Sequence, residues 1–533
     1  MSEAVAPLAG GSGKTFFGHP RGLFVLFFAE MWERFSYYGM RGLLVFYLTD
    51  HFLFDQQAAY GLYGAYTTLV YIAPVIGGVL ADRYLGQRKA VLFGAILLVL
   101  GHLGMAIEGE PVATGDDPDP TILNIFYFSL ALIIVGVGFL KANISTIVGE
   151  LYPKTDIRRD SAFTIFYVGI NIGAASGALI AGYLGETIGW GYGFGAAGIG
   201  MLLGLVVFIW GRPALEGAGE PPNPAVLSKK MVAGLSQEWL IYIGGFLGVI
   251  GVWLLVRDQG AVNILLLFVG ALTVGYILYR SVVTLEPHAR HRVYAAMILI
   301  STQVLFWGLF EQVGSSLNEF TREQVDRVIF GWEVPASMFQ SINPIYIIIL
   351  GPMFAALWLW LANRGLEPTT PQKFALALGQ LGFGFLVLVW GANSSDGLTP
   401  IIFIFLIYLL HTTGELCLSP VGLSAMTRLA VPSMVGLIMG TWFLASAAGN
   451  AVAALIAQAT AAVGPDGESV VLDVYANVGW FAIAVGIGMF AVSPLINRLM
   501  HLDTLQADTD KALAGAREIG EPAGPGVHPA TKT

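Results

Sequence analysis

Four charged side chains fall within twelve residues near the start of the chain, inside a segment that is otherwise apolar. The stretch FAEMWERFSYYG (28–39) carries Glu30, Glu33 and Arg34, and Arg41 follows shortly after. At 100° per residue, one face of a helix about 60° wide would carry four polar side chains: Glu30, Arg34, Tyr37 and Arg41. A carboxylate beside an arginine can be ionised and paired, or neutral and unpaired, so this stripe has the chemistry to bind a proton.

Composition indicates that the solvent around this helix is lipid. The chain has 533 residues, of which 56% are hydrophobic and 12% charged, whereas soluble proteins are roughly 45–50% apolar and about 25% charged. A charge that faces lipid at the bilayer midplane costs about 2.5–3.5 kcal/mol by insertion scales. We therefore expect the stripe to face a water-filled cavity or another helix. The alternative is an intrahelical ion-pair cluster that only fixes packing.

Long apolar segments along the chain predict an all-α integral membrane protein. A bilayer core needs about 20 apolar residues in a helix. Fourteen segments meet this requirement: 22–50, 59–81, 90–107, 121–148, 162–185, 192–210, 239–256, 261–279, 293–314, 339–361, 373–391, 399–422, 434–460 and 474–496.

Loop charge and linker positions predict orientation and organisation. Basic loops alternate with acidic loops, which places both termini in the cytoplasm by the positive-inside rule. A polar linker follows the sixth helix and a basic one follows the eighth, so we expect two six-helix halves with two extra helices between them. The predicted regions are a disordered N-terminus (1–18), a first bundle (19–211), a linker (212–237), the extra pair (238–281), a second bundle (282–500) and a disordered tail (501–533).

Three further charges lie deep in apolar segments. Lys141 lies in GVGFLKANIS, Glu311 in FWGLFEQVG and Glu415 in HTTGELCLSPVG. An unpaired buried charge is costly, so each needs a partner. We predict that Lys141 pairs with Glu415 and that Arg41 pairs with Glu311. Each pair would join the two halves across one face.

Four motifs together resemble a known family. They are EMWERFSYYG, FYVGINIGAASG (166–177), FWGLFEQ and GELCLSPVGLS, with GGVLADRYLGQRKA (77–90) as a cytoplasmic loop motif. The chain resembles the proton-coupled oligopeptide transporters of prokaryotic type, which belong to the major facilitator superfamily. The likeness spans nearly the whole chain and implies the major facilitator fold.

The resemblance also implies roles for individual residues. Glu30, Glu33 and Arg34 match the motif associated with proton coupling, and Glu311 is a second candidate. Arg41 and Lys141 match the basic residues that face a peptide carboxylate, and Glu415 matches the acid that faces the amino group. Other positions match residues near or lining the pocket: Asn171, Asn343, Tyr37, Tyr38, Tyr71, Trp307, Trp442 and Ser446. For Tyr37 and Tyr71, simple helix packing is the alternative.

The sequence thus predicts a proton-coupled symporter for di- and tripeptides in the bacterial inner membrane. Its partners would be peptides, protons and the bilayer, with no nucleic acid, and we expect a monomer that uses a proton gradient and no cofactor. No phosphate-binding loop or metal-ligand spacing appears, and His102 and His411 are expected to be packing residues. The same scaffold carrying nitrate or another small anion, or acting as a non-transporting receptor, stays open. An enzyme is not expected.

Overall fold

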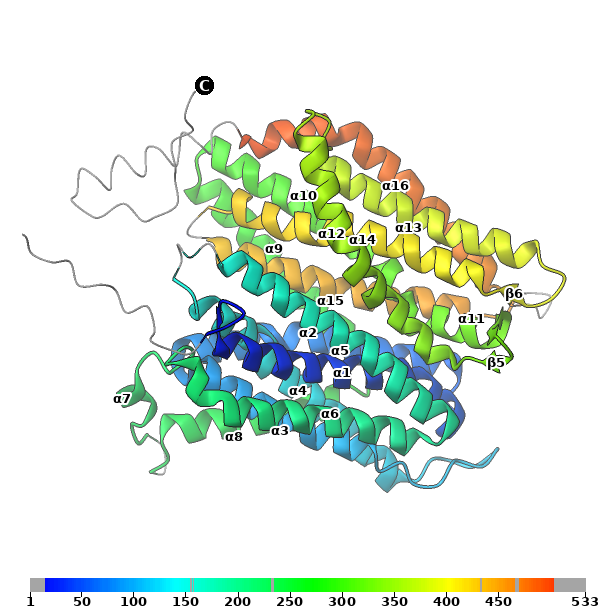
Figure 1. Ribbon diagram of the computed structural model, residues 1–533, viewed down its shortest axis with the longest axis horizontal. Coiled ribbons are helices and arrows are strands. Elements are labelled where there is room, and N and C mark those ends of the chain that lie inside the picture. Colours follow the sequence, from blue (N-terminus) through cyan, green and yellow to red (C-terminus); the bar gives the residue numbers. More distant parts are fainter. Residues whose placement is uncertain are drawn as a thin grey trace, which may run out of the picture.

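The computed structural model describes residues 15–153, 156, 158–231, 234–431, 434–464 and 469–502. Most of both predicted disordered ends therefore lies outside the described residues. Two groups of helices lie one above the other (Figure 1). We call the end of the molecule at which α1 begins and α16 ends the termini end, and the opposite end the far end.

The described chain is almost entirely helical. The α-helices are α1 (Arg21–Phe46), α2 (Gln56–Leu80), α3 (Gln87–Met105), α4 (Pro120–Glu150), α5 (Arg159–Thr187), α6 (Trp190–Gly211), α7 (Pro224–Leu227), α8 (Gln237–Leu255), α9 (Gln259–Thr284), α10 (Pro287–Phe310), α11 (Ser316–Gln324), α12 (Ile342–Ala362), α13 (Thr370–Asn393), α14 (Ile402–Leu429), α15 (Val435–Thr460) and α16 (Val471–Met500). Shorter π or 3₁₀ turns are η1 (Tyr47–His51), η2 (Ala81–Leu85), η3 (Arg212–Leu215), η4 (Glu311–Gly314) and η5 (Ala336–Ser341).

Helix length and composition fit a membrane. Thirteen spans within the described part of the chain are long and apolar enough to cross a bilayer. Helix α1 has 26 residues but carries too many charges to count among them. With α1 included, these fourteen spans correspond one to one with the fourteen predicted segments.

Polar residues at helix starts fix several boundaries. The side chains of Asp55 and Asp119 accept hydrogen bonds from backbone N–H groups in the first turns of α2 and α4. Ser236 and Asp258 do the same for α8 and α9, and Thr369 forms a capping box at α13. These caps satisfy N–H groups that have no partner within the helix. They explain why the short loops end where they do.

Two large apolar cores divide the helices into two bundles. One core is formed mainly by α1–α6 and the other mainly by α10–α16. Helix α8 packs on α4, whereas α9 contacts both α2 of the first bundle and α15 of the second. Fewer than a fifth of the residues in the apolar windows of α8 and α9 are buried, so this pair lies at the periphery.

The connections contain the few strands of the described chain. Strands β1 (Thr15–Phe16) and β2 (His19–Pro20) form a hairpin, as do β4 (Val328–Ile329) and β5 (Trp332–Glu333), while β3 (Val325–Asp326) pairs in parallel with β6 (Thr399–Pro400). The linker after α6 is not free of the first bundle. Arg88 donates to the carbonyl of Ala218 and to Glu220, which holds the linker against α3.

One predicted helix changes from α to 3₁₀ geometry in its last turn. The segment expected at 293–314 is a helix only to Phe310, and Glu311 begins the 3₁₀ turn η4 before α11 starts at Ser316. The following apolar segment, expected from 339, begins as α12 at Ile342 after the 3₁₀ turn η5. This change places Glu311 at the C-terminal end of α10.

Candidate functional site

A small cavity lies between the two bundles, with a volume of about 130 Å³. The first bundle contributes side chains from α1, α2 and α5, and the second from α10, η4, η5, α12 and α14. Its lining consists of Tyr38, Arg41, Tyr71, Tyr167, Ile170, Asn171, Ala174, Trp307, Phe310, Glu311, Val313, Gln340, Asn343, Pro344, Ile347, Tyr408 and Glu415. The charged members are one arginine and two glutamates, so the lining carries a formal net charge of +1 − 2 = −1.

The ion pair between Arg41 and Glu311 joins the two bundles. Arg41 Nη2 contacts Glu311 Oε2, and both side chains are under 5% exposed. Arg41 Nε also donates a hydrogen bond of 2.6 Å to the Tyr63 hydroxyl, and the guanidinium lies 5.7 Å from the Tyr38 ring centroid. Breaking one partner of such a buried pair typically costs about 3–5 kcal/mol. The predicted Arg41–Glu311 contact is thus present in this structure.

Glu415 has amide rather than cationic neighbours. Asn343 Nδ2 donates to Glu415 Oε2 at 3.0 Å and also to the Thr412 hydroxyl at 3.0 Å. No ion pair involves Glu415 among the described residues. A buried carboxylate on a cavity wall without a cation favours a positively charged guest.

The predicted contact between Lys141 and Glu415 is not formed in this structure. The Lys141 ammonium instead lies 4.1 Å from the centroid of the Tyr71 ring, a cation–π arrangement. The charges that act most strongly on it are those of Arg34, Glu33 and Glu30 in α1 and of Glu311. Lys141 therefore lies with the stripe of its own bundle and does not line the cavity.

The charges of α1 form a compact cluster behind the cavity wall. Arg34 Nε lies 3.1 Å from Glu30 Oε1 and also contacts Glu33. All three side chains are buried, and the Arg34 guanidinium lies 5.4 Å from the Tyr37 ring. The other oxygen of each glutamate, Glu30 Oε2 and Glu33 Oε1, has no hydrogen-bond partner among the described residues. With Lys141 the cluster holds two carboxylates and two cations, so it is formally neutral.

Small residues on α5 hold this cluster in place. A Cβ atom at Gly173 would lie 2.1 Å from the Met31 carbonyl oxygen, and one at Gly177 would lie 2.2 Å from the Phe35 carbonyl oxygen. The backbones of α1 and α5 therefore touch through a small-xxx-small contact. The motif FYVGINIGAASG is in part a packing surface. The same helix presents Tyr167 and Asn171 to the cavity.

The other predicted pocket residues divide into two groups. Tyr38, Tyr71, Asn171, Trp307 and Asn343 line the cavity. The remaining three lie behind the lining: Tyr37, Trp442 and Ser446. Ser446 accepts a 2.7 Å hydrogen bond from Gln303, and the Trp442 ring packs 6.4 Å from that of Phe374.

Sequence reasoning missed several lining residues. Tyr167 lies in the α5 motif and could have been found from that motif. Gln340 in η5 and Tyr408 in α14 carry no sequence signal, because their positions depend on the helix break and on the packing of α14. His102 and His411 are buried in apolar surroundings, and the His411 ring lies 5.0 Å from Phe385. No cluster of three metal-ligating side chains occurs in the described part of the chain.

Polar contacts close the interface between the bundles at the far end. Arg322 pairs with Asp50 at 2.6 Å, Asn318 donates to the carbonyl of Gly42 at 3.0 Å, and Gln458 donates to that of Gln57 at 3.0 Å. The Glu186 carboxylate accepts from the backbone N–H groups of η5. Between described residues, every hydrogen bond or ion pair that joins the bundles belongs to the far half.

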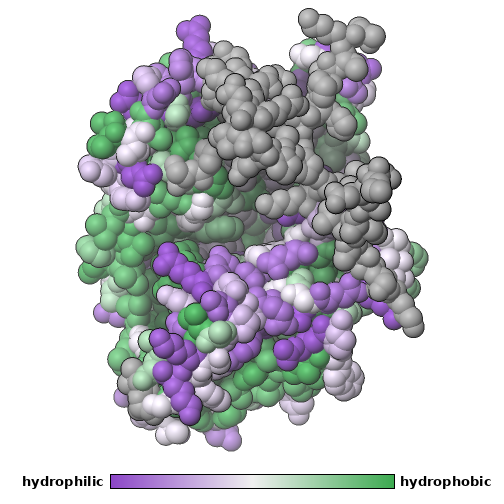
Figure 2. All heavy atoms as spheres, turned by 90° about the vertical axis from the view of Figure 1, so that its left-hand side faces the viewer, coloured by the Kyte–Doolittle hydropathy of each residue, from purple (hydrophilic) through white to green (hydrophobic). Residues whose placement is uncertain are grey.

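The termini end is open by comparison. Figure 2 shows this end, where a hollow containing apolar atoms separates the upper group of helices from the hydrophilic surface of the lower group. Of α12, only Ile342, Pro344 and Ile347 are buried, all within its first two turns. The bundles are thus joined at one end and apart at the other.

Comparisons with known proteins identify the scaffold. The sequence model of the POT family (PTR2) matches residues 88–471. The chain belongs to the POT family. It is 36% identical over 474 residues to the peptide transporter YePEPT of Yersinia enterocolitica. This alignment covers 83% of this chain and 88% of that protein. It is also 34% identical over 512 residues to a di-/tripeptide transporter of Lactococcus lactis, and the alignment covers 91% of this chain and 98% of that protein.

Solved POT structures have the same fold. A peptide transporter POT variant in complex with alafosfalin superimposes with a TM-score of 0.78 at 36% identity, covering 92% of this chain and 97% of that one. A POT family transporter in complex with 5-aminolevulinic acid gives 0.77 at 30% identity, covering 91% and 98%. The predicted family and major facilitator fold are confirmed. The protein is a multi-pass membrane transporter of a peptide-transporting family, not an enzyme.

Proposed function

We propose that this POT family member is a proton-coupled symporter that imports di- and tripeptides by alternating access. The observation that carries the proposal is the cavity between the bundles, where an Arg41–Glu311 pair and the cation-free Glu415 share one lining. Members of the family named as di-/tripeptide transporters align over nearly their full length.

A peptide zwitterion matches the distribution of charge in this cavity. Its amino group would bind Glu415, and its carboxylate would bind Arg41 or a reoriented Lys141. Side chains of the peptide would contact the aromatic lining, which includes Tyr38, Tyr71 and Trp307. A cavity lined with many aromatic groups and few polar anchors accepts variable side chains. The net charge of −1 on the lining disfavours nitrate or another simple anion.

The cavity must widen for a peptide to bind. Its volume of about 130 Å³ is below the roughly 300–1,000 Å³ of ordinary ligand pockets. Beyond Ile347, no residue of α12 is buried. We infer that this sparsely packed part of α12 moves to enlarge the site toward the termini end.

Proton coupling would act through carboxylates that hold cations. In this structure Glu311 forms an ion pair with Arg41. Glu30 and Glu33 attract the Lys141 ammonium electrostatically. Arginine cannot lose its proton, so a proton that arrives must go to a carboxylate. Protonated Glu311 would release Arg41 to a peptide carboxylate, and a protonated Glu33 would release Lys141 toward Glu415. Each release favours a different state of the bundles, as coupling requires.

Sidedness follows from loop charge. Arg88, Lys89, Arg158 and Lys229 lie at the termini end, whereas the acidic loop 106–119 lies at the far end. By the positive-inside rule we place the termini end in the cytoplasm of a bacterial inner membrane. The cavity would then be open toward the cytoplasm. We expect the monomer to be the functional unit, since both bundles of one chain complete the cavity.

Uptake into proteoliposomes tests the proposal. Labelled dipeptide should accumulate under an inside-alkaline gradient, and neither nitrate nor the N-acetylated dipeptide, which lacks the charged amino group, should do so. Binding of the dipeptide without accumulation would instead support a receptor. Accumulation that ignores the proton gradient would contradict the coupling mechanism.

The variant Glu33→Gln separates coupling from transport. It should lose gradient-driven accumulation and keep peptide-for-peptide counterflow, which needs only a site and alternating access. Glu333→Gln is a matched control, because Glu333 is an exposed glutamate that pairs with Arg327 in a far-end loop. Wild-type gradient dependence in Glu33→Gln would show that the α1 cluster is structural.

A further inference from the structure

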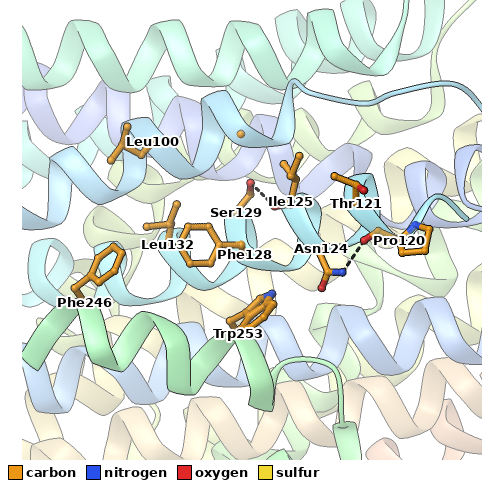
Figure 3. A pocket seen from close by; sticks show the side chains of 11 residues that line it. Leu100, Pro120, Thr121, Asn124, Ile125, Phe128, Ser129, Leu132, Phe246 and Trp253 are labelled. Carbon is orange, nitrogen blue, oxygen red and sulfur yellow. Dashed lines mark hydrogen bonds between the residues drawn. The ribbon is translucent and has the colours of Figure 1, made fainter.

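A second cavity faces the bilayer near the far end. It is a groove of about 720 Å³ between α3, α4 and α8. Figure 3 shows Phe128 and Leu132 of α4 facing Phe246 and Trp253 of α8 across it. Ile125 and Leu100 extend this apolar lining. None of its lining residues belongs to the peptide cavity.

The groove has the length of one membrane leaflet. Its lining on α4 runs from Pro120 to Leu132, which is about 18 Å along the helix axis at a rise of about 1.5 Å per residue. Half of a hydrocarbon core of about 30 Å is about 15 Å. An extended acyl chain parallel to α4 would therefore fill the groove from the far-end interface to the midplane.

A cation lies at the far-end mouth of the groove. Arg257, in the turn between α8 and α9, donates a 2.6 Å hydrogen bond to Asn124 Oδ1, and its guanidinium lies 4.3 Å from the Trp253 ring. Both of these neighbours line the groove. The guanidinium is thus held at the polar end of an apolar slot.

Arg257 differs from the other far-end arginines. Arg322 of α11 pairs with Asp50, and Arg327 of the following loop pairs with Glu333. Arg257 makes no ion pair with a described residue. The neighbouring Asp258 is engaged in capping α9 through the N–H of Ala261. A basic residue at the acidic end of a membrane protein, without an acidic partner, is suited to bind an external anion.

A second hydrogen-bond donor, on Trp253, lies beside the same mouth. Trp253 Nε1 is buried, and it has no hydrogen-bond partner among the described residues. A buried indole N–H usually finds an acceptor. The groove therefore has two hydrogen-bond donors near one end, and apart from Ser129 the side chains toward its other end are apolar.

We propose that this groove binds one phospholipid of the far leaflet. The phosphate would accept hydrogen bonds from Arg257, an ester or glycerol oxygen would accept one from Trp253 Nε1, and one acyl chain would lie between α4 and α8. The lipid completes the contact between the peripheral helix α8 and the first bundle. This site does not depend on which solute the transporter carries.

Native mass spectrometry of the delipidated full-length protein tests the site. Phosphatidylglycerol is added, and diacylglycerol with the same acyl chains serves as a ligand without phosphate. Arg257→Gln should weaken phosphatidylglycerol retention about fivefold, because a basic residue near the membrane surface contributes about that much to anionic lipid binding. Diacylglycerol retention should not change.

Two further variants make the test specific. Leu100→Trp, which places an indole in the groove at an exposed position, should reduce retention of both lipids. Arg364→Gln is the matched control, since Arg364 is also exposed and stacks on a tryptophan, Trp360, but lies in the other bundle. A thermal melt checks that each variant is folded. Equal phosphatidylglycerol retention in wild type and Arg257→Gln, or a dimer that excludes lipid from the groove, would overturn the proposal.

Discussion

Two pairs of charges were expected to join the bundles, and only one of the two pairs is formed in the structure. Arg41 and Glu311 meet between α1 and η4, while Lys141 and Glu415 remain apart, one over Tyr71 and the other beside Asn343. The first pair belongs to the closed far half and the second faces the open termini end. In this conformation one pair is formed and the other is not, and under the alternating access proposed above we expect the two pairs to exchange.

Removal of Arg41 should have the largest effect. Arg41→Ala leaves Glu311 buried without its cation, and we expect the free energy of unfolding to fall by about 3–5 kcal/mol. Thermal or denaturant melts in detergent measure this loss. The double variant Arg41→Ala with Glu311→Gln should recover at least half of the loss. If the single and double variants melt together, the ion pair does not hold the far end closed.

Removal of the Glu415 charge should affect binding and leave stability unchanged. Glu415→Gln keeps the shape of the side chain and its contact with Asn343 but loses a charged acceptor, which is worth about 1.5–3 kcal/mol. Dipeptide affinity should fall at least tenfold by calorimetry. The melting temperature should stay within a degree or two. Near-native affinity would remove Glu415 from the peptide site.

The contact between α1 and α5 lies within one bundle and should be rigid. The contacts between the two bundles, in contrast, would have to change during the proposed alternating access. Gly177→Ala would force the new methyl group against the backbone of Phe35, and overpacking of this kind costs about 1–3 kcal/mol. Gly270→Ala in α9 is the control, because nothing lies within 4 Å of a Cβ at that position. Equal melting curves for both variants would contradict the close approach of α1 and α5.

The smallest effect is expected at the surface of the far end. Asp50→Asn removes one partner of Arg322, whose guanidinium keeps a 2.8 Å contact with Glu319. Exposed pairs contribute about 0.2–1 kcal/mol. A melt should therefore show less than a third of the loss seen in Arg41→Ala. A larger loss would mean that closure depends on the surface pair instead of the buried one.

Helical periodicity and charge were enough to predict one part of the site. The stripe on α1 and the Arg41–Glu311 contact arise from the high cost of lipid-exposed or unpaired charge, and that cost applies whatever the conformation. The position of Lys141 could not be predicted in the same way. Several partners lie within reach of its long side chain, and the spacing of the bundles selects among them.

The break after Phe310 was also beyond the sequence pattern. No proline occurs between 301 and 317, and Gly308, which could have ended a helix, lies within α10. Two tertiary contacts favour the 3₁₀ turn. Gln312 donates a hydrogen bond to the carbonyl of Ala453 in α15. The Tyr63 hydroxyl approaches Gly314 so closely that a Cβ atom at Gly314 would lie 1.8 Å from it. These are tertiary contacts, which periodicity does not encode.

The break has an electrostatic consequence, because it makes Glu311 the residue that caps the C-terminus of α10. The aligned peptide dipoles of a helix leave about half a negative charge at that end. Glu311 therefore adds a full negative charge where the backbone is already negative, and Arg41 balances both. If the far half opens, as the proposed alternating access requires, the carboxylate and the helix end would both lose this cation. The dipole of α10 would therefore add to the cost of separating the bundles at this point.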